Sequence, residues 1–420
     1  EELAALVLAG SFYFVVFLVG AGFSFAVLPM VANASELGDD VKVRRITRMG
    51  LWISALYAMI LIPFMWWSKP LLVGLGQADV TAQLAQDYLR IAGFGLFPAL
   101  FVMVIKNYLA ALERTQFVLW LTVATALLNV VLNYMLVFGN WGAPELGVRG
   151  AAIASVAIVT LSLPVLVIYA KAVMPEHVLF QRIWAVDRGA LVQVFRLGWP
   201  IGLTNLAETG LFTAAAILVG WIGTHELAAH GIALQWASLT FVVHLGLSNA
   251  ATVRAGRAIG RQDMVRLKRG GVMVTAMSLG FGFIIVAIFL AWPEALIGVF
   301  IDSTDPARDQ IIAVGVALLM MAALFQIADA IQVIALGLLR GAQDTRMPMV
   351  FAWISYWVIG LPASYVMGFV WDYGAVGVWM GLVFGLSVAA VLLNVTTSPS
   401  SSTPHSGSRA TTTSRLAQPC

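Results

Sequence analysis

The sequence predicts an all-α protein that crosses a membrane many times. Hydrophobic residues make up 60% of its 420 residues and charged residues only 11%, and the mean hydropathy is +0.91. Soluble domains usually contain about 25% charged residues. The apolar runs are continuous over about 20 positions or more, as membrane helices require, and lack the alternation of a transmembrane barrel. This composition excludes a water-soluble enzyme.

Eleven stretches are long and apolar enough to span a bilayer, and several exceed the minimum length, which predicts tilted helices. Their expected ranges are 4–33, 48–68, 83–112, 117–138, 148–171, 193–222, 227–253, 270–292, 309–339, 347–370 and 374–395. Interior prolines predict kinks in four of them, at Pro29, Pro98, Pro164 and Pro362.

Lysine and arginine concentrate in alternate loops, which sets the expected orientation. They follow the first, fifth, seventh and ninth stretches, whereas the other loops hold almost none. Because cytoplasmic loops carry the excess of basic residues, we expect these four loops to face the cytoplasm of a bacterium, with the protein in its plasma (inner) membrane. Since topology explains the basic clusters, no nucleic-acid partner is expected.

The chain contains an internal repeat. The motif ELAA at residues 2–5 recurs at 226–229, and further matches follow in the same order with offsets of about 225 residues. In the second half a whole span precedes this motif, so we expect one helix to be missing upstream of the first. The intact protein would then have two homologous lobes of six helices. We expect lobes at 1–180 and 181–395, and a disordered Ser/Thr/Pro-rich tail at 396–420.

Two carboxylates lie in the middle of apolar spans, where a charge costs roughly 2.5–3.5 kcal/mol. Glu208 shares a helix face with Asn205, and Asp329 shares one with Gln326 and Gln332. Neither acid has Lys or Arg within about one turn of sequence. Such a carboxyl can take up and release a proton, or hold a hard cation such as sodium. The alternative is that each acid only hydrogen-bonds a neighbouring helix.

Further polar residues form stripes on two other spans. In the first half Thr122, Thr125, Asn129 and Asn133 share a narrow arc; in the second, Gln235, Ser238 and Asn249 do so. Each stripe predicts either a water-filled path or a hydrogen-bonded seam between helices. We expect Lys106, His230 and His244 to have structural roles. No zinc motif, phosphate-binding loop or nucleophile elbow is present, so we expect no enzyme and no cofactor other than sodium.

Several motifs resemble those of the multidrug and toxic compound extrusion (MATE) family, and most closely its NorM-type branch. The second half contributes Gly198–Pro200, Glu208–Phe212, Ala229–Leu234 and Asp329–Gln332, the last running into Leu339–Gly341 and Asp344–Thr345. The first half contributes LNVVLNYMLVFG, which holds Asn129 and Asn133, followed by GVRGAAIAS. The resemblance covers about 1–395.

The resemblance implies a fold and an activity. It implies two six-helix lobes forming a V around a central cleft, and antiport of cationic amphipathic drugs, by a monomer, against sodium ions or protons. Glu208 and Asp329 match the acids that couple transport to the cation. Asn129 and Asn133 match partners of an acid on the absent first helix. Phe325, one turn before Asp329, stands where some relatives carry tyrosine and offers no oxygen.

Two other interpretations of the function remain open. One is a flippase for lipid-linked saccharides, which has a related architecture. Its phosphate-bearing cargo would need a cavity rich in arginine and lysine. The central charges here are acidic, which favours a drug exporter. The other interpretation is that the chain is a fragment without transport activity, because we expect its first helix to be missing.

Overall fold

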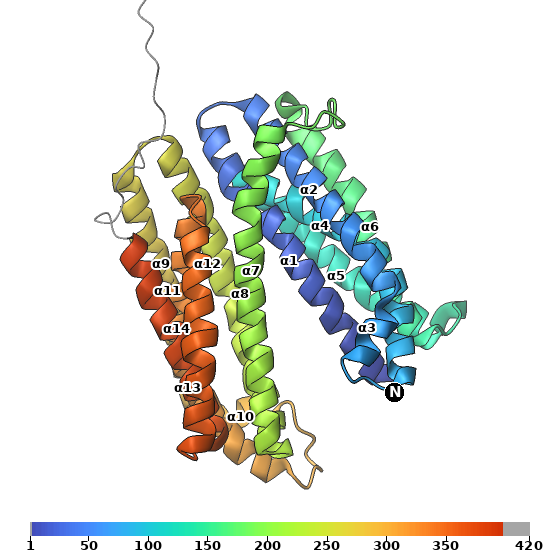
Figure 1. The fold of residues 1–420 in the computed structure, drawn as a ribbon, viewed down its shortest axis with the longest axis vertical. Helices are drawn as coiled ribbons and strands as arrows, with labels where there is room; N and C mark the ends of the chain where they lie inside the picture. Colours follow the sequence, from blue (N-terminus) through green and yellow to red (C-terminus); the bar gives the residue numbers. More distant parts are fainter. Residues whose placement is uncertain (1, 398–420) are drawn as a thin grey trace, which may run out of the picture.

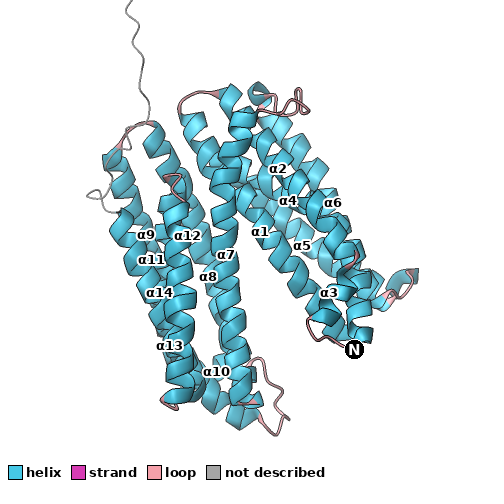
Figure 2. Ribbon diagram, viewed as in Figure 1, coloured by secondary structure: helices cyan, strands magenta, loops and turns pink. Residues whose placement is uncertain are grey.

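The computed structural model describes residues 2–397, which form helices joined by short loops and contain no strand (Figure 2). The expected tail beyond Thr397 lies outside the described residues, and α14 takes in Thr396 and Thr397. The spanning helices are α1 (Glu2–Glu36), α2 (Asp40–Trp66), α4 (Asp79–Ala111), α5 (Thr115–Phe138), α6 (Gly147–Val173), α7 (Arg188–Ile222), α8 (Thr224–Gly260), α9 (Met264–Ala291), α11 (Arg308–Gly341) and α14 (Gly374–Thr397).

One further crossing is interrupted. It consists of α12 (Arg346–Trp353), a π-helical stretch η3 (Ile354–Gly360), α13 (Leu361–Tyr365) and a second π-helical stretch η4 (Val366–Val370). Pro362 lies between the two π-helical stretches. The ring of proline removes a backbone N–H donor and disturbs the regular hydrogen bonds of an α-helix. A helix can accommodate this disturbance by forming π-type turns. By contrast, α1, α4 and α6 run on through Pro29, Pro98 and Pro164.

The eleven expected spans are confirmed, but several helices extend beyond the predicted ends. The second begins at Asp40 rather than at 48, and the seventh reaches Gly260 rather than 253. The Asp39 carboxylate accepts a hydrogen bond from the Lys42 backbone amide, which caps α2 at its N-terminus. Apolar periodicity cannot find these ends because they are made of polar residues outside the lipid.

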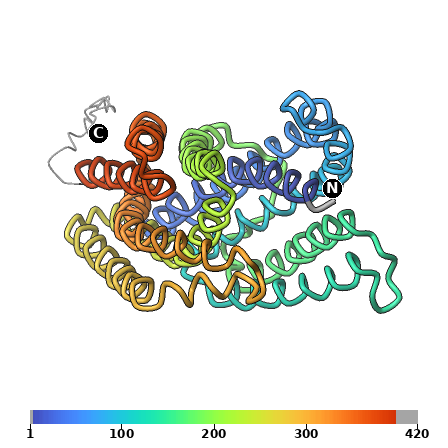
Figure 3. Tube along the Cα trace, turned by 90° about the horizontal axis from the view of Figure 1, so that it is seen from below, coloured from blue at the N-terminus to red at the C-terminus, as the bar shows by residue number. Residues whose placement is uncertain are grey.

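The helices form two lobes (Figure 1). One lobe contains α1 to α6 and the other α7 to α14, and they meet at one end of the molecule and diverge toward the other, in a V. We call the end where they meet the basic end; α1, α8 and α11 end there, and α2, α7 and α9 begin there. Figure 3, viewed from the opposite end, shows the two bundles side by side.

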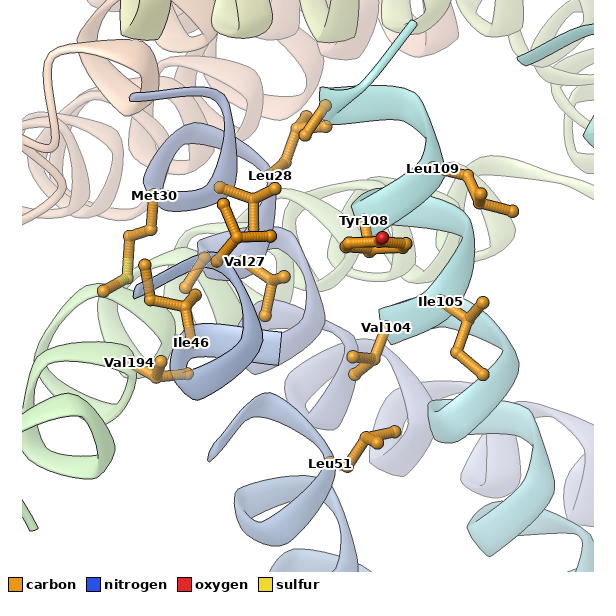
Figure 4. Packing of buried hydrophobic residues seen from close by; sticks show 14 of the residues in the cluster. Val27, Leu28, Met30, Ile46, Leu51, Val104, Ile105, Tyr108, Leu109 and Val194 are labelled. Atoms are coloured by element: carbon orange, nitrogen blue, oxygen red, sulfur yellow. The ribbon is translucent and has the colours of Figure 1, made fainter. Parts of the chain in front are cut away.

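A buried apolar cluster joins the lobes near the basic end (Figure 4). Most of its residues come from α1, α2 and α4, but Val194 comes from α7 in the second lobe. The residues labelled in Figure 4 are Val27, Leu28, Met30, Ile46, Leu51, Val104, Ile105, Tyr108, Leu109 and Val194. Inside lipid such contacts stabilise through close packing, because the surrounding acyl chains are equally apolar.

Glycines allow α1 and α7 to approach closely. A Cβ atom on Gly22 would lie 2.4 Å from the backbone nitrogen of Gly202 and 2.6 Å from the carbonyl oxygen of Gly198. Small residues at such crossings let two backbones touch. The two lobes are therefore in backbone contact across this part of their length.

The linker between the lobes, residues 174–187, is fixed to the first lobe by buried hydrogen bonds. The hydroxyl of Tyr108 on α4 lies 2.6 Å from Nδ1 of His177, and Nε2 of His177 lies 3.4 Å from the Asp40 carboxylate. The Trp52 indole donates to the carbonyl oxygen of Ile183 at 2.7 Å. The expected lobe boundary at 180 falls within this linker.

Tyr108→Phe is expected to destabilise the protein by about 1–3 kcal/mol, because it leaves a buried ring nitrogen of His177 without its partner. A lower midpoint of thermal unfolding in detergent would show this. Tyr365→Phe is the matched control, since Tyr365 is exposed and only stacks on Phe369. Equal midpoints for the two variants would contradict the role assigned to the Tyr108–His177 contact.

Candidate functional site

Asp329 is a buried carboxylate in the middle of α11, with only 1% of its surface exposed. Neither carboxylate oxygen has a hydrogen-bond partner, and no ion pair involving Asp329 occurs within residues 2–397. A buried carboxylate without partners is costly and is retained when a proton or a cation can join it. These two oxygens are the main candidates for a cation-binding position.

Two neighbouring side chains add oxygens beside Asp329. Gln332 uses its amide nitrogen to donate to the hydroxyl of Tyr356, which comes from η3 and is fully buried. The side-chain oxygen of Gln332 is buried and has no hydrogen-bond partner in the described part of the chain. Carboxylate, amide and hydroxyl oxygens are the ligands that hard cations prefer.

Glu208, on α7, lies close enough to Asp329 for the two charges to act on one another. An arginine is also near. Arg340, at the end of α11, donates to the side-chain oxygen of Asn205 at 3.2 Å, one turn before Glu208, and its charge acts on Glu208. The guanidinium carbon also lies 5.9 Å from the ring centre of Phe25, on the first lobe.

The proximity of Arg340 corrects one expectation. Glu208 has no basic residue within a turn of sequence, but in space Arg340 reaches it from another helix. The two side chains nevertheless do not form an ion pair within 4.0 Å, the limit at which such pairs are recorded for residues 2–397. The three charges therefore form an open cluster rather than a closed salt bridge.

Gln326 is separate from this cluster. Its amide nitrogen donates to Thr240 on α8, and its oxygen lies 3.3 Å from Nε2 of His244, whose Nδ1 lies 2.7 Å from the hydroxyl of Ser278 on α9. This buried network links α8, α9 and α11. The structural role of His244 stays a prediction, and these hydrogen bonds agree with it.

The remaining sequence-predicted residues make no hydrogen bond or ion pair to Glu208 or Asp329 within residues 2–397. Gln235 is exposed and makes no hydrogen bond to another described residue. On α5, in the other lobe, the amide of Asn133 donates to the side-chain oxygen of Asn129 at 2.8 Å. Lys106 donates to Thr122 at 3.2 Å, which ties α4 to α5. His230 is buried and accepts a hydrogen bond from Trp379 at 3.0 Å.

Phe325 lies one turn from Asp329 and packs between aromatic rings. Its ring centre is 5.8 Å from that of Phe212 and 6.0 Å from that of Trp379. It supplies no oxygen, whereas Tyr356 brings a hydroxyl from a different helix. The sequence did not single out Tyr356, because its span, 347–370, also contains the hydroxyl groups of Ser355, Ser364 and Tyr365.

Comparison with known families decides the identity. The MatE family model matches residues 1–135 and 200–366, and so covers both lobes. The chain belongs to this family. The MATE proteins are transporters, so the prediction that the chain is not an enzyme agrees with its family.

The curated relatives of this MATE chain include NorM proteins. It is 44% identical over 395 residues to the probable multidrug resistance protein NorM of Rhizobium meliloti, covering 94% of this chain and 85% of that one. It is 45% identical over 397 residues to the protein of the same name from Agrobacterium fabrum, with the same coverage. These matches confirm the NorM-type resemblance.

Solved MATE structures share the fold. A MATE crystal structure in the straight conformation matches with a TM-score of 0.84 at 19% identity, over 94% of this chain and 87% of that chain. A eukaryotic MATE transporter matches with a TM-score of 0.82 at 20% identity and the same coverage. The predicted all-α architecture of two lobes is thereby confirmed.

Proposed function

We propose that this chain is an antiporter that exports cationic amphipathic drugs or toxins in exchange for sodium ions or protons. The observation that carries the proposal is the buried Asp329 carboxylate, whose oxygens have no partner within the described residues. Such a group must bind a proton or cation to stay in the bilayer interior at low cost. The NorM names of the curated relatives support a drug as the exported molecule.

The sign of the central charges favours a cationic substrate over a lipid-linked saccharide. Glu208 and Asp329 provide two negative groups against the single positive group of Arg340. A phosphate-bearing cargo needs the opposite excess, because phosphate pairs with guanidinium and ammonium groups. Drug and coupling ion would therefore both be attracted to this cluster, and the arrival of one would promote the release of the other.

Alternating access would be achieved by movement of the lobes 1–180 and 181–395 about their contacts. Ion pairs hold the basic end closed: Arg261 on α8 pairs with Glu36 on α1, and Arg257 pairs with Glu113 at 2.8 Å and donates to the carbonyl oxygen of Ala111 at 3.1 Å. With the basic end facing the cytoplasm, this arrangement is the outward-facing state. Opening toward the cytoplasm requires these pairs to separate.

Glu36→Arg is expected to reduce efflux several-fold, because it places like charges together where the closed lobes need an attraction. Adding Arg261→Glu restores the opposite charges with their positions exchanged. Recovery of efflux in the double variant, measured in proteoliposomes, would support an ion pair that closes this end. If the double variant transports no better than Glu36→Arg alone, Glu36 acts in some other way.

Transport in proteoliposomes tests the proposed function. The purified chain is reconstituted, a sodium or a proton gradient is imposed in separate experiments, and the movement of ethidium is followed by fluorescence. We expect ethidium to move against its gradient under one of the two conditions and to stop when an ionophore collapses that gradient. Ethidium movement that continues unchanged when an ionophore collapses the sodium gradient, and also when one collapses the proton gradient, would refute coupled antiport.

A further inference from the structure

A pocket lined by arginines lies at the basic end of the first lobe, between the first turns of α2 and the linker. Its volume is about 570 Å³, and its charged lining residues are Arg44, Arg45, Arg48, Arg182 and Asp187. Four guanidinium groups face one carboxylate, which leaves a net charge of +3 (4 − 1). None of the residues that line the pocket belongs to the cluster around Asp329, and the proposed antiport does not use them.

The donors of these arginines are only partly satisfied. Arg48 is 7% exposed; its Nη1 donates to the carbonyl oxygens of Gln181 and Arg182, both at 2.8 Å, but its Nε is buried without a partner in the described chain. Arg45 lies 3.5 Å from Asp187. The side chain of Arg182 makes no hydrogen bond or ion pair to any described residue, so several donors remain available.

The unbalanced charge favours an anion. The charges of Arg44 and Arg45 repel that of Arg48, and Asp187 offsets only part of this repulsion. Guanidinium groups present donors in a planar fork that matches the oxygens of a phosphate group. A phosphate held between Arg44, Arg48 and Arg182 would use the free donors and relieve the repulsion.

We propose that this pocket binds the phosphate of an anionic phospholipid, in the leaflet that meets the basic end. The linker that forms one wall also exposes apolar side chains, with Trp184 74% exposed, Val186 48% and Val178 45%. Tryptophan is typical of the membrane interface, and basic pockets at the ends of membrane helices bind anionic headgroups. A lipid would fill both the arginine pocket and the apolar surface, whereas free phosphate would use the arginines alone.

The bound lipid would add to the hydrogen bonds by which Arg48 and Trp52 already hold the linker on α2. Arg44 and Arg48 belong to α2, and Gln181 and Arg182 belong to the segment that joins the two lobes. A headgroup contacting both would make this connection more rigid. Lipid composition would then influence the connection between the lobes without changing the cation-binding residues.

The test is a lipid titration of the full-length protein in detergent, followed by native mass spectrometry. Wild type, Arg44→Gln/Arg182→Gln and the control Arg266→Gln/Arg269→Gln are each titrated with phosphatidylglycerol and with phosphatidylcholine. The control removes two exposed arginines from α9 at the same end but outside the pocket. We expect phosphatidylglycerol to bind wild type and the control alike, and the pocket variant about 10-fold more weakly. Equal weakening in both double variants, or equal affinity for the two lipids, would overturn the proposal.

Two further measurements separate the sources of phosphate and locate the site. Inorganic phosphate is used as a competitor, and we expect it to displace phosphatidylglycerol only at much higher concentration, because it lacks the acyl chains. Hydrogen exchange of 178–187 is expected to slow when phosphatidylglycerol is added to wild type, but not in the pocket variant. Phosphate binding as tight as that of the lipid, or unchanged exchange in this segment, would refute a lipid site here.

Discussion

Asp329→Asn is expected to reduce gradient-driven ethidium efflux at least about 10-fold, because it removes the charge that couples cation and drug in the proposed mechanism. Asparagine has nearly the same size and can still occupy this buried position on α11. The protein should therefore fold normally, while the coupling ion loses its carboxylate. Efflux in proteoliposomes and the dependence of its rate on the imposed gradient would measure the loss.

Asp309→Asn is the matched control for this prediction. Asp309 lies on the same helix, in its exposed first turn, so the chemical change is identical but occurs away from the cluster. Glu208→Gln is expected to impair efflux as well, and also to remove the negative group nearest Arg340. Wild-type efflux with wild-type gradient dependence in Asp329→Asn would refute the coupling role.

Gly22→Ala is expected to destabilise the state with the basic end closed by about 1–3 kcal/mol relative to the open state. The new Cβ atom would collide with backbone atoms of α7, which cannot move aside as a flexible side chain can. At about 1.4 kcal/mol per factor of ten, the population ratio of closed to open lobes should fall by roughly 5- to 150-fold. Spin labels at Arg114 and Lys268, one on each lobe and both exposed, would report longer distances in a Cys420→Ser background.

Gly10→Ala supplies the comparison on the same helix. No atom lies within 4 Å of the position of its new Cβ, so the same substitution adds a methyl group without a collision. This variant should show the wild-type distance distribution and wild-type efflux. If Gly22→Ala also leaves both unchanged, the lobes do not need the backbone contact between α1 and α7 to close.

Composition and apolar runs were sufficient to predict the membrane class and the eleven spans, because a bilayer allows few other arrangements of such a chain. They could not predict where the helices end outside the lipid, since capping by residues such as Asp39 is a local polar interaction. Glu208 and Asp329 were identified as carboxylates inside apolar spans, and the MATE resemblance then matched them to coupling acids. A shared site for the two acids was an expectation of the sequence, but their relation in space comes from the fold, because Glu208 lies on α7 and Asp329 on α11.

Helical periodicity misassigned Gln326 for a geometric reason. Three residues advance the helix by about 300°, so Gln326 and Gln332 lie about 60° to opposite sides of Asp329. Gln326 therefore reaches Thr240 and His244 on α8, and Gln332 reaches Tyr356. Tyr356 was missed because it lies in a π-helical stretch, in which the periodicity of a regular α-helix no longer predicts the direction of side chains.

Arg340 also gives the transport cycle an electrical signature. With both acids ionised, Glu208, Asp329 and Arg340 sum to one negative charge, and binding one monovalent ion brings the sum to zero. On the proposed cycle, the ion-loaded lobes would reorient without responding to the membrane voltage. The form that holds a monovalent cationic drug in place of the ion would also sum to zero, whereas the vacant form would carry one charge, worth up to about 2.3 kcal/mol per 100 mV. Voltage would then act on the vacant form alone, and one-for-one exchange of ethidium should produce no net current, which recordings from reconstituted protein could check.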